Sequence, residues 1–252
     1  MKIAILTALA LGPLLTVLPP HAHATELRVF SSEALKSVLN ALGPKFQKST
    51  GNTLTFTLEA SGSIKSKVDK GAAFDVVIVT PPLLKALAAS GKVDANTQAV
   101  IARSALGASV AKGAPKPDVS TPDALKRTLL NAKSIGFNGK GASRTAIEAI
   151  LAKLGVADAL KPKIKLLTIN APKAVANHEV ELALSPISLI FAVPGAQLAG
   201  ALPAEDQWYL TLSGAVAAAS KAPSQSKALI QFLTGPSAVA VLKENGMEPG
   251  KS

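Results

Sequence analysis

Short apolar runs alternate with longer amphipathic segments along most of the chain. Apolar runs bounded by turn residues predict strands at residues 27–30, 54–58, 75–80, 134–138, 165–169, 181–184 and 208–219. Apolar positions three and four residues apart predict helices at residues 34–42, 81–89, 122–132, 143–154, 172–177, 224–233 and 236–244. We expect Gly43 and Pro44 to kink or restart the first helix. Strands that alternate with helices are typical of an α/β protein with largely parallel sheets.

Two segments have the pattern of connections between separate lobes. Residues 97–129 lead from an extended apolar stretch through a turn rich in proline and lysine into a new helix, and residues 206–246 provide the return. Two such crossovers predict two lobes, one formed by residues 25–105 with 208–252 and the other by residues 106–207. We expect a cleft between them, because ligands of open α/β sheets bind at the carboxyl ends of the strands.

The first 24 residues have the pattern of a cleavable secretory signal peptide. One lysine precedes an apolar stretch that is broken by Gly12 and Pro13, and the segment ends in Ala-His-Ala. A membrane span would need about 20 uninterrupted apolar residues. We therefore expect a mature chain that begins at Thr25 and resides in the periplasm, where the absence of cysteine leaves no disulfide framework.

The chain is basic, with a formal net charge of +11. Such a charge is compatible with a nucleic acid, an anionic membrane or an anionic solute, or simply with lysines scattered over a soluble surface. Aromatic residues make up only 4% of the chain and there is no arginine-rich run, which argues against nucleic-acid binding.

Three predicted strands each end in a turn rich in serine and glycine that leads into a helix. The polar residues of these turns are Ser31 and Ser32, Ser61 and Ser63, and Ser143 and Arg144. Free backbone N–H groups and the positive end of the helix dipole make a helix start an anion site. Each serine could also be an ordinary N-cap, but three such turns favour helix starts that converge on one anion.

These turns, together with the flanking sequences, resemble the type II periplasmic solute-binding proteins of the molybdate-binding-protein-like family. The resemblance extends over nearly the whole mature chain and includes VFSSEALKSVL, SGSIKSKVDKGAAFDVVIVT, FNGKGASRTAIEAILAKLG and LIQFLTGPSAVAVLKENGMEP. It implies a two-lobed fold, a small anion in the cleft and the permease of an ABC transporter as partner. We expect a monomer without cofactor or metal. By resemblance, the five serines line the cleft and donate hydrogen bonds.

The sequence departs from the pattern of molybdate binders in two places. Ala34 stands where molybdate binders usually have a serine, just before the leucine of the first helix, and Pro186 and Ser188 stand where the family often has a tyrosine. Lys140 and Arg144 beside the third turn favour an organic acid, because the guanidinium fork suits a carboxylate. Alternatively, Arg144 pairs with the glutamate four residues later on an exposed helix face.

An enzyme related to this family, aconitate isomerase, provides the alternative function. Isomerisation of aconitate requires a base near an acidic C–H bond and groups that stabilise the developing negative charge. The candidate bases are Glu33, Lys140 and His178. His178 is the one histidine of the mature chain, which excludes a histidine-cluster metal site, and it is expected at a helix end. No catalytic triad, nucleophile elbow or phosphate loop appears.

Overall fold

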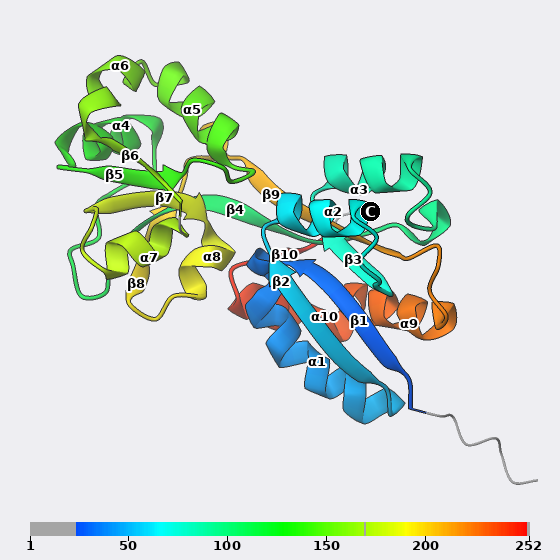
Figure 1. The fold of residues 1–252 in the computed structure, drawn as a ribbon. Coiled ribbons are helices and arrows are strands. Elements are labelled where there is room, and N and C mark those ends of the chain that lie inside the picture. Colours follow the sequence, from blue (N-terminus) through cyan, green and yellow to red (C-terminus); the bar gives the residue numbers. More distant parts are fainter. Residues whose placement is uncertain (1–23, 169, 251–252) are drawn as a thin grey trace, which may run out of the picture.

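The computed structural model describes residues 24–168 and 170–250, so the predicted signal peptide lies almost entirely outside the described residues. The strands form one continuous sheet system that runs through two lobes (Figure 1). Their bounds are β1 Glu26–Ser32, β2 Thr53–Glu59, β3 Val76–Val79, β4 Ala99–Ala111, β5 Ile135–Asn138, β6 Ile164–Leu167, β7 Leu182–Pro186, β8 Ala196–Ala201, β9 Tyr209–Val216 and β10 Glu248–Pro249.

Helices cover both faces of the sheet in each lobe (Figure 1). The α-helices are α1 Lys36–Thr50, α2 Ser61–Asp69, α3 Pro81–Ala89, α4 Pro122–Asn131, α5 Arg144–Lys153, α6 Ala157–Leu160, α7 Ala171–Ala176, α8 Ile187–Phe191, α9 Pro223–Thr234 and α10 Pro236–Glu244. Short 3-10 segments occur at η1 Glu33–Leu35, η2 Ala95–Thr97, η3 Lys161–Lys163 and η4 Ala204–Asp206. Among the described residues, no helix combines the length and the hydropathy needed to cross a membrane.

The strand order is β2-β1-β3-β9-β4-β7-β5-β6, with β8 and β10 paired to β4. In one lobe β1 pairs in parallel with β2 and β3, and in the other β5 pairs in parallel with β6 and β7. The long strands β4 and β9 are antiparallel to each other and run between the lobes (Figure 1). The parallel strands of both lobes present their carboxyl ends toward the space between the lobes, since residues at these ends line the cleft between them.

Each lobe has an apolar cluster on either side of its sheet. In the first lobe α1, α9 and α10 pack around Leu35, Leu39 and Phe46, while α2 and α3 pack around Ile64 and Leu87 on the other face. All four residues of β3 are buried, as expected for a central strand that helices cover on both faces. The second lobe has a large cluster beneath α4, α5 and α6 and a small one beneath α7.

Apart from the end of the first helix, the boundaries of the predicted strands and helices agree with the structure within three residues wherever it describes them. The helix does not restart at Gly43-Pro44: α1 continues through both residues to Thr50, with Pro44 inside it. The glycine has a packing role: a Cβ at Gly43 would lie 3.2 Å from the Phe56 ring on β2. The sequence patterns also miss α6, α8, β8 and β10, which are too short or too irregular in hydropathy to produce a clear period.

The crossing between the lobes lies at the middle of β4 and the start of β9. Trp208, immediately before β9, packs against the main apolar clusters of both lobes. The predicted lobe boundaries, 105/106 and 207/208, fall at this crossing and stay a prediction. The α/β two-lobed architecture itself is confirmed by the arrangement of the strands and helices.

Candidate functional site

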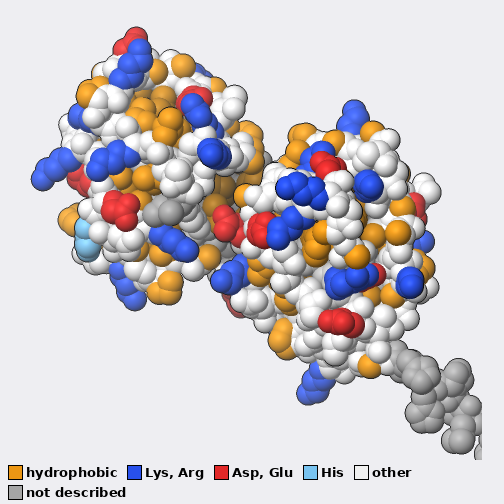
Figure 2. Space-filling view, in the orientation of Figure 1, with side chains coloured by type: hydrophobic (Ala, Val, Ile, Leu, Met, Phe, Trp, Pro, Cys, Tyr) orange, Lys and Arg blue, Asp and Glu red, His pale blue; other side chains and the backbone are white. Residues whose placement is uncertain are grey.

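A cleft of about 750 Å³ lies between the lobes. Its walls come from residues that end or directly follow the parallel strands β1, β2 and β3 of one lobe and β5, β6 and β7 of the other. This volume is within the range of about 300–1,000 Å³ that is typical of small-molecule sites. Figure 2 shows the corresponding waist between the lobes, where side chains of both charges gather.

The first lobe presents the start of α2 to the cleft. Ser61, Gly62 and Ser63 form the first turn of this nine-residue helix, and all three line the cleft. Ser61 is buried, whereas Ser63 is exposed. The first backbone N–H groups of a helix have no acceptor inside the helix. The α2 start therefore offers hydroxyl and amide donors together with the positive end of the helix dipole.

The second lobe presents the turn between β5 and α5. Within this turn the backbone N–H of Lys140 donates to Asn138 Oδ1 at 2.8 Å, and the N–H of Arg144 donates to the Gly141 carbonyl at 3.1 Å. Lys140, Gly141 and the buried Ser143 line the cleft. Two of the three predicted turns thus face each other across the cleft.

The first predicted turn has a different structure from the one expected. β1 does not end at Phe30 but continues through Ser32, because Ser31 and Ser32 still pair with Leu58 and Glu59 of β2. Ser32 lines the cleft, but its side chain makes no capping hydrogen bond to the described η1 helix. Ser31 is fully buried within the strand, its hydroxyl donates to the Ser32 carbonyl at 3.2 Å, and it is not among the lining residues.

Arg144 is also outside the cleft lining. Its Nε donates to Glu148 Oε1 at 2.8 Å, and its Nη1 donates to the Gly139 carbonyl at 2.8 Å. The sequence left open whether Arg144 binds a carboxylate ligand or pairs with Glu148 on the helix surface. The structure has the pair with Glu148. The guanidinium instead braces the β5–α5 turn, which makes Arg144 a support for the turn that carries Ser143.

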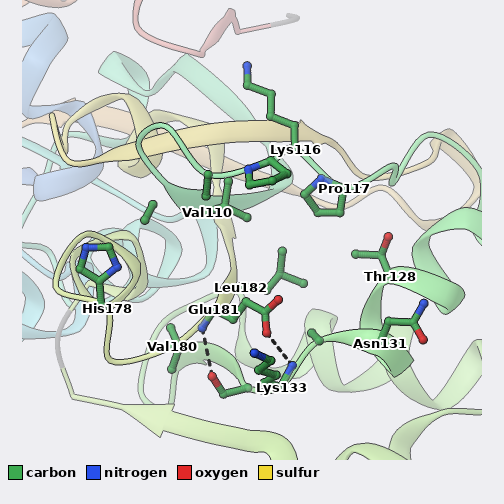
Figure 3. A pocket seen from close by; sticks show the side chains of 15 residues that line it. Val110, Lys116, Pro117, Thr128, Asn131, Lys133, His178, Val180, Glu181 and Leu182 are labelled. Carbon is green, nitrogen blue, oxygen red and sulfur yellow. Dashed lines mark hydrogen bonds between the residues drawn. The ribbon is translucent and has the colours of Figure 1, made fainter.

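The three candidate bases do not lie together. Glu33 and Lys140 line the cleft from opposite lobes. His178 is exposed and lines a separate pocket of about 710 Å³ in the second lobe, between the β4–α4 loop and the start of β7 (Figure 3). It follows the end of α7 with a positive φ of 58°, a conformation that suits this helix end. In the same pocket the Glu181 carboxylate accepts from the Lys133 backbone N–H at 2.7 Å.

Charges in the cleft are balanced between the two signs. Its titratable side chains are Glu33, Glu59, Lys140 and Lys173. Glu59 already pairs with Lys67 at 2.9 Å, so Glu33 is the cleft carboxylate without an ion pair among the described residues. The lysines belong to the second lobe. The net positive charge of the chain is therefore not concentrated in the cleft.

Several cleft residues are not indicated by the sequence motifs. They are Thr80, Thr168, Asn170, Lys173 and Ser185. Each lies at or just beyond the end of a strand or at the start of the following helix. The general rule that ligands bind at the carboxyl ends of strands would have found them. Of the two second-lobe positions left open, Pro186 lines the cleft, whereas Ser188 is buried beside β4 and is not among the lining residues.

The donor set suits an anion rather than a metal ion. Hydroxyl and backbone N–H groups dominate the α2 start and the β5–α5 turn. Among the described residues, there is no group of three or more histidine, cysteine, aspartate or glutamate side chains that could hold a metal ion.

Comparison with known proteins gives a relative by sequence and several similar structures. The chain is 28% identical to an aconitate isomerase from a Pseudomonas species, over 97% of each chain. The periplasmic molybdate-binding protein of Azotobacter vinelandii has a TM-score of 0.75 at 18% identity, covering 89% of this chain and 100% of that one. The sulfate-binding protein SubI of Mycobacterium tuberculosis H37Rv has a TM-score of 0.73 at 18% identity, covering 89% and 87%. At these identities the two structural likenesses show the fold alone.

The match to a protein family covers most of the chain. Residues 27–248 match the family described as bacterial extracellular solute-binding protein. This range includes both lobes, both crossing strands and every residue of the cleft. The chain therefore belongs to the bacterial extracellular solute-binding protein family.

Proposed function

We propose that this protein captures a small anion, an oxyanion or an organic di- or tricarboxylate, in the interlobe cleft of the periplasmic mature chain and delivers it to the permease of an ABC transporter. The observation that carries the proposal is the opposition of two donor-rich turns, the α2 start and the β5–α5 turn, across one cleft. The ionised oxygens of such an anion accept hydrogen bonds and offer none. Donors from both lobes are then satisfied only when the lobes close on the anion.

The affinity follows from the number of these donors. A hydrogen bond to a charged group contributes about 1.5–3 kcal/mol. Three to five such bonds, after the costs of association, give roughly micromolar binding or better. The contacts would come from both lobes, so that ligand binding and lobe closure are coupled.

The first experiment is thermal unfolding of the mature protein with molybdate, tungstate, sulfate, phosphate, citrate and the two aconitate isomers. A ligand present at about a thousand times its Kd adds roughly 4 kcal/mol, which moves Tm by several degrees for a chain of this size. A shift with one class of anion identifies the ligand class. Absence of any shift and of any binding by calorimetry would refute anion capture.

Serine variants test the location of the site. Ser63→Ala in the first lobe and Ser143→Ala in the second should each weaken the anion found above by about tenfold or more, because each removes a charge-assisted hydrogen bond. Ser224→Ala is the matched control, since Ser224 is an exposed serine in the first turn of α9, which is outside the cleft. Equal affinity in all three variants would place the binding site elsewhere.

A second candidate function is isomerisation of aconitate, and the full-length relationship to an aconitate isomerase favours it. In this reaction a base removes a proton from a carbon next to the double bond, the negative charge spreads into the adjacent carboxylate, and a proton returns to the other end of the allyl system. Glu33 is the candidate base and Lys140 faces it from the other lobe. Proton NMR of cis-aconitate with the protein separates the two functions: a binder leaves the isomer unchanged, whereas an isomerase produces the trans form and loses this activity in Glu33→Gln.

A further inference from the structure

The side chain of Asn170, at the edge of the cleft, is in an energetically unfavourable environment. It precedes α7 as its N-cap residue and lines the cleft from the second lobe, but its side chain makes no capping hydrogen bond to α7. Its Oδ1 atom is buried and has no hydrogen-bond partner among the described residues. A buried acceptor in this state is rare in proteins, because it loses water without gaining a replacement.

The location of this atom distinguishes it from the other buried atoms in the same state. Within the described part of the chain these are Ser188 Oγ and Asp206 Oδ2. Neither Ser188 nor Asp206 lines the cleft. Asp206 already receives a hydrogen bond from Lys153 through its other oxygen at 2.7 Å. Of the three, Asn170 is therefore the residue that borders the cleft, where rotation of its side chain would bring the unpaired oxygen to a ligand.

Other acceptors lie on the cleft walls. The hydroxyl of the buried Ser185, at the end of β7, donates to the Pro186 carbonyl at 3.4 Å, which leaves its lone pairs for a donor. From the first lobe, Glu33 contributes a carboxylate, which accepts hydrogen bonds only. The cleft thus combines donors for an anion with acceptors that an anion alone does not satisfy.

We propose that the ligand is a hydroxycarboxylate, whose carboxylates bind the donor turns and whose hydroxyl group donates to Asn170. This assignment rests on the proposed function and specifies its ligand class. Molybdate, sulfate and fully ionised carboxylates without a hydroxyl group have no hydrogen to donate. An ammonium donor is disfavoured at this position, because Lys140 and Lys173 line the same wall of the cleft. Asn170 is accordingly a specificity-determining residue.

Pairs of acids that differ by one hydroxyl group test the assignment directly. Citrate is compared with propane-1,2,3-tricarboxylate, and malate with succinate, by calorimetry on the mature protein. The hydroxylated member should bind about ten to a hundred times more tightly, since its analogue leaves the buried carbonyl oxygen unpaired. In Asn170→Ala this ratio should fall to near one, mainly through weaker binding of the hydroxylated member.

Two further variants define the control. Asn170→Asp keeps an acceptor, so it should preserve the ratio within a pair while its added charge weakens both members together. Asn177→Ala changes an exposed asparagine just beyond the other end of α7, whose amide donates to Glu179, and should alter neither affinity nor ratio. Loss of the ratio in Asn170→Asp would mean that the amide N–H group faces the ligand, which overturns the assignment.

The outcomes separate this assignment from the proposed function. Equal binding of the two members of each pair by the wild-type protein, or a preference that survives in Asn170→Ala, overturns the hydroxycarboxylate but leaves anion capture standing. Binding of molybdate or sulfate alone has the same meaning. If no anion of either class binds, the proposed function itself fails. The wild-type comparison remains decisive even if Asn170→Ala does not fold.

Discussion

At the scale of single residues, the clearest structural interaction outside the cleft is made by Asp75. Its buried carboxylate accepts from the Arg28 backbone N–H at 2.9 Å and from the Arg28 Nε at 3.1 Å, while its other oxygen accepts from the Ser220 hydroxyl at 2.9 Å. Burial raises the pKa of Asp75, but the hydrogen bonds from Arg28 and Ser220 outweigh it and hold the pKa below its ordinary value of 3.8. The ionised form therefore ties β1 to the start of β3 and to the loop after β9.

Asp75→Asn should lower the free energy of unfolding by about 1–3 kcal/mol at pH 7, because it removes a charged acceptor from buried donors. A depressed pKa stabilises the fold above the pKa of the unfolded chain, and this contribution is lost as the pH falls below about 4. Urea unfolding at pH 7 and pH 3.5 should show that the difference between wild type and variant narrows at the lower pH.

The surface pair of Asp158 and Lys161 provides the control for this comparison. Both side chains are largely exposed, and their pair at 2.8 Å spans one helical turn. Asp158→Asn should leave stability almost unchanged at both values of pH, since exposed ion pairs contribute little. A difference for Asp75→Asn that is independent of pH would contradict the role assigned to its charge.

At the scale of elements, the crossing of β4 and β9 is held by the side chain of Gln207. Its Oε1 accepts from the backbone N–H groups of Leu106 and Trp208 at 2.7 and 3.0 Å. Its Nε2 donates to the carbonyl oxygens of Leu106 and Leu202 at 3.1 and 3.0 Å. One amide group thus connects β4, the segment after β8 and the residue before β9 at the point where the chain passes between lobes.

Gln207→Leu should lower the free energy of unfolding by about 1–3 kcal/mol, because it removes the side-chain partner of the Trp208 N–H and of the Leu202 carbonyl at nearly constant side-chain volume. Chemical denaturation of the variant measures this loss. Gln98→Ala, at an exposed glutamine before β4, should stay within about 0.5 kcal/mol of wild type. Equal stability of the two variants would show that the crossing is held by the strand pairing alone.

At the scale of the whole molecule, the proposed capture of an anion includes closure of the two lobes around it. Trp208 is the one tryptophan of the chain, and it packs against the main apolar clusters of both lobes. Residues at a hinge between domains take up the changes in backbone dihedral angles during such a closure. The fluorescence of Trp208 should therefore report lobe closure directly, without an added label.

Titration with the anion that the protein binds should shift the emission wavelength of Trp208. The midpoint of this change should lie at the Kd measured by calorimetry. Small-angle X-ray scattering of the same samples should show a smaller radius of gyration in the bound state. The Ser63→Ala and Ser143→Ala variants should require correspondingly higher anion concentrations for both changes. Binding by calorimetry without any change in emission or radius would argue for a cleft that is already closed, rather than for hinge closure.

Much of the fold is determined by local patterns in the sequence. The helix at residues 81–89 and the strand at 53–59 follow from hydropathy period and from turn residues, which act over a few positions and leave a signal in any short window. The serine- and glycine-rich starts of α2 and the β5–α5 turn are visible in the same way. The continuation of α1 through Pro44 is not visible in a short window, and neither is the close approach of Gly43 to Phe56, which belongs to a separate strand.

Only the tertiary structure decides which of the candidate residues meet. Ser31 is withdrawn from the cleft by pairing of β1 with both of its neighbours, and Arg144 is engaged by Glu148 and the Gly139 carbonyl. Conversely, the role proposed for Asn170 depends on the burial of its side-chain oxygen, which no local sequence pattern encodes. By itself, the sequence determines that hydrogen-bond donors gather at the ends of strands, because each strand end, its turn and the following helix start are neighbours in the chain. The assembly of two lobes determines which donors and acceptors share one cleft, since residues far apart in the chain become neighbours only when the strands cross.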